Sequence, residues 1–427
     1  MHGLYIHVPF CSTRCGYCDF NTYTPQELSA ADGGAVEGNT IPGYLDALER
    51  ELEIAAEVWD YPGEVQTVFF GGGTPSMLGH EGLARALNAA RRTVGLAADA
   101  EVTTEANPES TSPEFFTGLR EAGFNRISLG MQSAMGHVLK VLERQHTPGR
   151  PIEATREAKQ AGFEHINLDV IYGTPTETDD DLQRTLDAVL EADVDHVSAY
   201  SLIVEDGTSM ARKVRRGELP APDEDTLADR YDAIDARLRQ AGFHWYEVSN
   251  WAKPGGECQH NLIYWRSGQW WGAGPGAHGC VRLHGEGHSE SGLVRLVNAK
   301  RPTTYWNGLL GEAEGASIGK DGLPVPGAVV TTERLSDDDL RTEQVMLRLR
   351  LAEGLDLAEL VDGTDGARSA RSAQNANPAR NAELGQVIER YTGLGLLDKH
   401  GERLRLTDKG RYLADGIVTD IVLALGL

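Results

Sequence analysis

The segment QAGFEHINL at residues 160–168 carries the pattern that decides the fold of this chain. A helix-like stretch ends at Gly162, and a β-rich run follows after a short gap. Glycine accepts the left-handed backbone conformation that closes a helix. The same pattern recurs at residues 121–129, 191–199 and 240–248, mostly with the glycine. The repeating unit is therefore helix, short loop, strand.

Strands and helices alternate outward from these segments. We expect strands at residues 4–9, 66–71, 101–106, 126–131, 165–171, 196–203 and 244–248. We expect helices at residues 42–59, 80–94, 113–122, 134–143, 151–161, 179–191 and 224–241. Such alternation predicts parallel βαβ units. The expected fold is α/β, a full or partial (β/α) barrel, with an open doubly wound sheet as the alternative.

A change of composition near residue 250 predicts that the chain is organised in three parts. Residues 1–250 are expected to form the barrel, and residues 336–427 a small winged-helix-like α+β domain. Residues 251–335, between them, contain the segments HNLIYW and GAGPGAH. Within this middle part, residues 284–330 are rich in Gly, Glu and Ser and are expected to be a loop or insertion.

The overall charge narrows the range of partners. The chain has 427 residues and a net charge of -24, which disfavours nucleic acid and anionic membranes and favours protein or small-molecule partners. It has no apolar run long enough to span a bilayer and no signal-peptide pattern at its start. The five cysteines make a poor disulfide framework. We expect a cytoplasmic protein, and peripheral contact with a membrane stays open.

The sharpest motif is the trio Cys11, Cys15 and Cys18, spaced CxxxCxxC. Three thiolates on a short loop can hold three irons of a [4Fe-4S] cube and leave the fourth iron open, whereas closed sites use four cysteines. An open iron can chelate a small ligand. A zinc site that lacks its fourth ligand, and three unrelated thiols, are the alternatives.

A glycine-rich element, GGGTP at residues 71–75, follows the second expected strand. Glycines let the backbone approach a ligand closely. Taken alone, the segment favours a plain Gly-Pro turn. Its place after the second strand of an expected barrel favours ligand binding, because the chemistry of such barrels lies at the C-terminal ends of the strands.

The cysteine spacing resembles that of the radical S-adenosylmethionine (SAM) superfamily. Together with FFGGGTPS, EANPES, RISLGMQS, LERQH and NLDVIYGTPTET, it is similar to the family of oxygen-independent coproporphyrinogen III oxidase (HemN). The resemblance implies a (β/α) barrel, a [4Fe-4S] cluster on the three cysteines and SAM on the open iron. It also implies an electron donor, because an electron from the cluster cleaves SAM to a 5′-deoxyadenosyl radical.

The same resemblance assigns residues to SAM by matched motif. Gly72, Gly73 and Thr74 would contact SAM, and Glu105 would hold its ribose or amino acid part. The remaining positions, which flank the cluster or surround a second SAM in that family, are Tyr5, Tyr17, Gln132, Arg144 and Asp169. The alternatives are ordinary strand-end charges for Glu105 and Asp169, a helix C-terminal cation for Arg144 and a loop hydrogen bond for Gln132.

Two features separate the branches of the family. The decarboxylase pattern has a further cysteine two residues after the third, where this chain has Phe20. The segment HNLIYW at residues 260–265 matches an HNxxYW signature of the heme chaperone branch, HemW, with WGAGPGAHG following. The closest resemblance is therefore to the branch whose members bind heme and pass it to target proteins. A true coproporphyrinogen III dehydrogenase and a zinc-bound module are the rival functions.

Heme candidates lie in and beside that signature. His260 could ligate iron as a neutral imidazole, and Cys258 could do so as a thiolate. Tyr264 and Trp265 offer flat apolar area to a porphyrin. The alternative is that His260 hydrogen-bonds a turn and the aromatic rings are core. His278 could sit at the end of the barrel near SAM or have a structural role.

Overall fold

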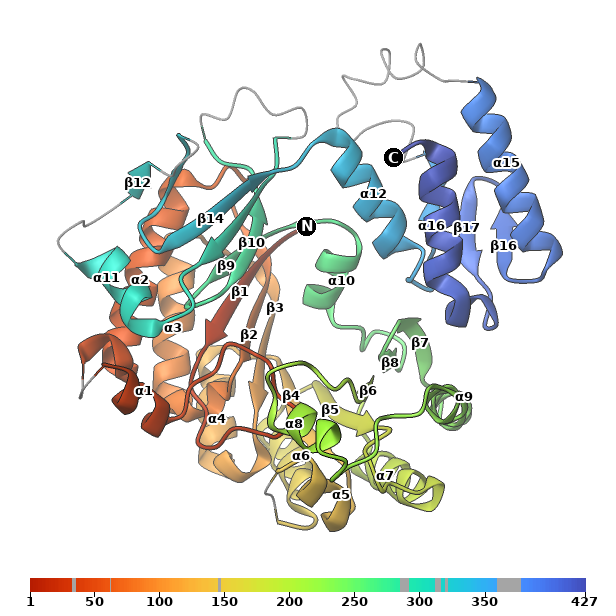
Figure 1. Ribbon diagram of the computed structural model, residues 1–427. Coiled ribbons are helices and arrows are strands. Elements are labelled where there is room, and N and C mark those ends of the chain that lie inside the picture. The colour runs from red at the N-terminus through yellow and green to blue at the C-terminus, as the bar shows by residue number, and fades with distance from the viewer. Residues whose placement is uncertain are drawn as a thin grey trace.

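One large mixed sheet organises the fold (Figure 1). The computed structural model describes residues 1–32, 36–61, 63–144, 147–284, 292–311, 316–318, 322–358 and 378–427. Within these residues the sheet has 12 strands in the order β14-β11-β10-β9-β1-β2-β3-β4-β5-β6-β8-β7.

Parallel βαβ units form the centre of the sheet, as the sequence predicts. The consecutive parallel strands are β1 (His2–Val8), β2 (Val65–Gly72), β3 (Leu96–Ala106), β4 (Arg126–Gln132), β5 (His165–Tyr172) and β6 (His196–Ser201). The helices of this part are α1 (Pro25–Asp32), α2 (Ile41–Val58), α3 (Gly79–Thr93), α4 (Pro113–Ala122), α5 (Gly136–Val141), α6 (Arg150–Ala161), α7 (Asp179–Ala192), α8 (Ser209–Arg215) and α9 (Glu224–Gln240).

Local signals explain where these helices begin and end. Ser112 caps α4 through a hydrogen bond from the Phe115 N–H, and Pro113 occupies the first helical position. Gly123 and Gly162 adopt left-handed conformations at the ends of α4 and α6. The repeated glycines therefore close helices as expected.

The expected strand at 244–248 behaves differently from its predecessors. It appears as β7 (His244–Glu247), which turns directly into β8 (Asn250–Ala252). β8 pairs antiparallel with both β6 and β7. A connection this short cannot cross over to a parallel strand. The parallel run thus ends at β6, and in the described residues the sheet is a partial barrel with two distinct edges.

The other edge is built from residues after 258. Helix α10 (Gln259–Trp265) leads into β9 (Gln269–Ala273), which pairs in parallel with β1. The sheet then continues antiparallel through the elements β10 (His278–Val281), β11 (Val294–Asn298) and β14 (Val329–Arg334).

The expectation of a loop is wrong for much of the described part of residues 284–330; residues 285–291, 312–315 and 319–321 lie outside the described residues. The described part contains β11, helix α11 (Pro302–Leu310) and the strands β12 (Ala316–Ile318) and β13 (Pro324–Pro326). Buried apolar side chains at Val294, Leu296 and Leu309 attach it to the core. The overall composition of the segment did not indicate these elements, because their apolar residues lie between glycine-rich stretches.

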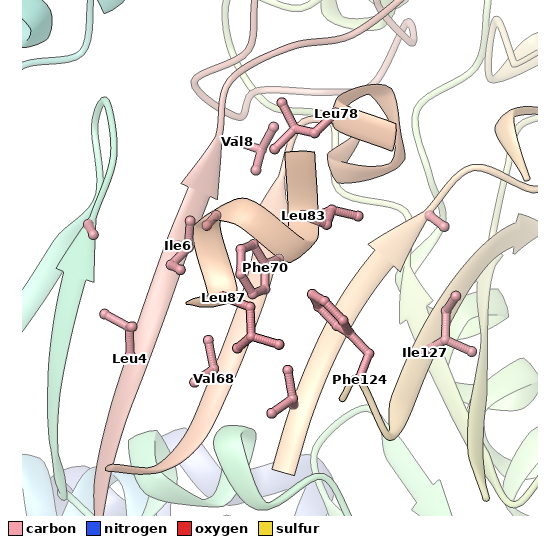
Figure 2. Packing of buried hydrophobic residues seen from close by; sticks show 14 of the residues in the cluster. Leu4, Ile6, Val8, Val68, Phe70, Leu78, Leu83, Leu87, Phe124 and Ile127 are labelled. Carbon is pink, nitrogen blue, oxygen red and sulfur yellow. The ribbon is translucent and has the colours of Figure 1, made fainter. Parts of the chain in front are cut away.

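The main core lies between the sheet and its helices. Figure 2 shows Leu4, Ile6 and Val8 of β1 beside Val68 and Phe70 of β2, with Leu83 and Leu87 of α3 over them. The three β1 side chains are fully buried. Alternate residues of β1 therefore anchor the strand that leads to the three cysteines.

The C-terminal part has its own small core. Its elements are α12 (Asp337–Arg348), β15 (Leu355–Asp356), α15 (Pro378–Gly393), β16 (Leu397–His400), β17 (Arg403–Leu406) and α16 (Ala414–Leu425). The helix, hairpin, helix order that the sequence predicts is present. In the residues that the structure describes, no helix is both long and apolar enough to cross a bilayer.

Candidate functional site

The three cysteines lie on the loop that follows β1 and line one cavity of about 540 Å³. All three are free thiols with partly exposed side chains. In the described ranges, no group of three or more His, Cys, Asp or Glu side chains is placed to hold a single metal ion. A cube spreads its thiolates over three different irons.

The glycine-rich element packs directly against the cysteine loop. Gly73 N–H donates to the Val8 carbonyl at 2.8 Å, and Thr74 N–H donates to the Phe10 carbonyl at 2.7 Å. A Cβ at Gly73 would stand 2.6 Å from the Phe10 oxygen, so this position requires glycine. Thr74 Oγ1 donates to Cys11 Sγ at 3.6 Å.

Arg144 brings positive charge to the same cavity. Its Nη1 donates to Cys15 Sγ at 3.7 Å, and its Nη2 donates to the Gly130 carbonyl at 3.0 Å. Its Nε is buried and, among the residues that the structure describes, has no hydrogen-bond partner. Arg144 therefore lines the cysteine cavity. The alternative of an ordinary cation at a helix C-terminus does not explain these contacts.

Two carboxyl groups line the cavity from β3 and β5. Glu105 accepts a hydrogen bond from Gly72 N–H at 3.2 Å, and burial followed by the nearby Asp169 raises the pKa of Glu105 to about 8. Asp169 accepts hydrogen bonds from Ser128 and Asn167, yet burial still raises its pKa. An entering cation would favour ionisation of both groups.

The remaining sequence-predicted positions lie around these groups. Gln132 ends β4 with φ of 64°, a left-handed value that is uncommon for a residue other than glycine. It lines the cavity together with Tyr17, whereas Tyr5 lies in an adjoining one. Tyr200 at the end of β6 also lines the cysteine cavity, and the sequence analysis did not assign it to the site.

This donor set fits an iron–sulfur cluster with SAM. The cysteine cavity is lined by free thiols, the glycine-rich end of β2, the guanidinium of Arg144 and two carboxyl groups. Among the described residues, the Nε of that guanidinium is unpaired. Cys11, Cys15 and Cys18 would hold the cluster. The cluster would supply a low-potential electron.

Known proteins match nearly the whole chain. Residues 5–189 match the radical SAM superfamily, and residues 335–413 match the HemN C-terminal domain. The heme chaperone HemW of Mycobacterium tuberculosis is 52% identical over 420 residues, which cover 98% of this chain and 94% of that protein. The chain belongs to the HemW family of radical SAM proteins.

Further relatives agree with this HemW assignment. The heme chaperone HemW of Bacillus subtilis is 33% identical over 83% of this chain and 85% of its own length. The structure of coproporphyrinogen III oxidase (HemN) from Escherichia coli superposes with a TM-score of 0.74 at 23% identity, covering 98% of this chain and 89% of HemN. This likeness shows that the HemW family member shares the HemN fold.

The HNxxYW signature of this HemW family member lies at the opposite end of the barrel from the cysteines. It forms α10, which packs near the start of β1, where a Cβ on Gly3 would stand 2.9 Å from Ile263. The His260 Nδ1 is 2.7 Å from Thr67 Oγ1, and its Nε2 is 2.7 Å from the Tyr264 hydroxyl. Burial lowers the pKa of His260 to about 3.

Both ring nitrogens of His260 are thus engaged, which favours the structural alternative for this residue. Cys258 is buried, its Sγ donates to Glu101 at 3.6 Å, and burial raises its pKa to about 12, so it remains a thiol. Trp265 packs with Tyr246 and Leu351 in a separate small cluster. Tyr264 lines a cavity of about 620 Å³, whereas His260 and Cys258 line a smaller one of about 140 Å³.

Proposed function

We propose that this chain is a heme chaperone, which binds heme next to the iron–sulfur site and passes it to target proteins. The observation that carries the proposal is the 52% identity to a heme chaperone over 98% of the chain. A second cavity of about 620 Å³ supports it. Its volume lies within the usual range of small-molecule sites.

Phe20 favours carriage of heme over oxidation of a porphyrinogen. It is 62% exposed and lines both the cysteine cavity and the second cavity. The decarboxylase pattern has a cysteine at this position. An exposed aromatic ring offers stacking area to a porphyrin and no thiol chemistry.

Several further assignments belong to this proposal. The chain would need heme-receiving proteins and an electron donor for the cluster. The net charge of -24 favours protein partners over nucleic acid. A cytoplasmic location fits cysteines that form no disulfide and would hold a cluster.

An anaerobic assay distinguishes the carrier from the enzyme. The protein with reconstituted cluster is incubated with reductant, SAM and coproporphyrinogen III, and the porphyrins are separated by chromatography. We expect no decarboxylated product, because Phe20 replaces the cysteine of the decarboxylase pattern. Catalytic formation of protoporphyrinogen would overturn the proposal in favour of a coproporphyrinogen dehydrogenase.

A further inference from the structure

We propose that heme binds in the cavity between β9–β10–β11 and α12, with His278 as its axial ligand and Lys300 facing a propionate. This inference rests on the proposed heme-chaperone function and adds the site. The cavity has a volume of about 620 Å³ and lies beside the cysteine cavity, with which it shares Phe20, Gly72 and Glu105.

The walls of the cavity are largely apolar and come from two elements. Trp270 of β9 and Leu293, just before β11, lie on the sheet side. Leu340 and Leu347 lie on the helix side, seven positions apart on one face of α12. The chain passes from β14 directly into α12 (Figure 1). A flat apolar macrocycle fits between a sheet and a helix of this kind.

His278 stands on the cavity side of β10. Residues two apart on a strand point to the same face, and His278 and Cys280 both line the cavity. His278 is exposed, and in the described part of the chain its ring makes no hydrogen bond or ion pair. Burial, Lys300 and Arg295 lower its pKa, which keeps the imidazole neutral at neutral pH, the form that ligates iron.

The other candidate iron-binding side chains near the cavity are either hydrogen-bonded or protonated. His7 Nδ1 is 3.0 Å from the Tyr5 hydroxyl and its Nε2 is 2.9 Å from the Asn21 carbonyl. His260 has both nitrogens occupied, as described above. Burial raises the pKa of Cys280 to about 11, so it is a thiol at neutral pH. Among the described histidines named here, His278 is thus the one whose ring lines this cavity with both nitrogens unpaired.

The cavity also offers positive charge for the two carboxylates of heme. Lys300 is exposed at its edge, and among the described residues its ammonium group has no hydrogen bond or ion pair. Arg295 lines the same space but is already paired with Glu343. An unpaired ammonium group at the edge of an apolar cavity is suited to form an ion pair with a heme propionate.

The edge of the cavity at Lys300 is connected to the cysteine loop by hydrogen bonds. Asn21 Nδ2 donates to the carbonyl oxygens of Pro275 and Lys300 at 2.9 and 2.8 Å. A Cβ at Gly276, which has φ of 76°, would meet Asn21 at 2.5 Å. Hydrogen bonds and close packing of Asn21 therefore connect the proposed heme site to the cluster loop.

The test is a heme titration of cluster-loaded wild type, His278→Ala and Lys300→Glu, followed in the Soret band. We expect His278→Ala to weaken heme binding about tenfold or more and to change the ferric heme spectrum. Added imidazole should restore the wild-type spectrum. Lys300→Glu should weaken binding several-fold without changing the spectrum.

His400→Ala is the matched control, because His400 is exposed on the distant β16 hairpin; we expect unchanged affinity and spectrum. His278→Ala with wild-type affinity and spectrum would overturn the site assignment, as would a spectral change in His260→Gln alone. Wild type that carries a complete cluster and binds no heme would instead refute the proposed function. Iron content and circular dichroism of each variant show that the fold is retained.

Discussion

Replacing Cys15 with alanine is expected to abolish the iron–sulfur cluster while the chain remains folded. Cys15 lies on a loop, is partly exposed and receives a hydrogen bond from Arg144, so its loss leaves the main core untouched. A cube held by only two thiolates should not survive purification. Iron and sulfide assays should fall from about four of each per chain to near zero, with loss of the brown colour.

The control for this experiment is Cys258→Ala. Cys258 is buried beside Glu101, away from the cavity that Cys11, Cys15 and Cys18 line. Its iron content should equal that of the wild type. Full iron content in Cys15→Ala would contradict the ligand assignment, whereas loss of iron in Cys258→Ala would indicate a fourth thiol ligand.

Glu51→Ala is expected to cause a large fall in the free energy of unfolding. Glu51 on α2 is fully buried, and burial raises its pKa. It accepts hydrogen bonds from Gly274 N–H at 2.8 Å, Asn298 Nδ2 at 2.7 Å and the Tyr305 hydroxyl at 2.5 Å. Alanine would leave these buried donors unpaired. We expect the free energy of unfolding to fall by about 3 kcal/mol or more.

Urea denaturation of the apoprotein measures this change. Glu53→Ala on the same helix is the matched control, because the Glu53 side chain is 54% exposed and forms a surface ion pair with Arg50. Its effect should stay within about 0.5 kcal/mol. Equal stability of Glu51→Ala and the wild type would show that Glu51 does not hold α2 to β11 and α11.

Local patterns were enough to predict the parallel part of the fold. Gly123 and Gly162 mark helix ends, and each is followed by a buried strand. These signals depend on neighbours in sequence. The cysteine loop and GGGTP were therefore expected at the C-terminal ends of adjacent strands, where the structure places them.

Pairings between distant segments could not be predicted in this way. β9 pairs in parallel with β1 although the paired residues lie 267 positions apart, and its sequence QWWGA lacks a clear alternation. The same limit applies to the two histidines. His260 is engaged by Thr67, 193 positions away, whereas His278 faces a cavity formed in part by α12. Whether an imidazole is free depends on such tertiary contacts.

The most direct test of the account is the stoichiometry of heme on the wild-type protein with its cluster in place. Anaerobic protein with complete iron and sulfide content is titrated with ferric heme, and the bound heme is measured after gel filtration. We predict one heme per chain. Protein that has a complete cluster and elutes without heme would contradict the central claim.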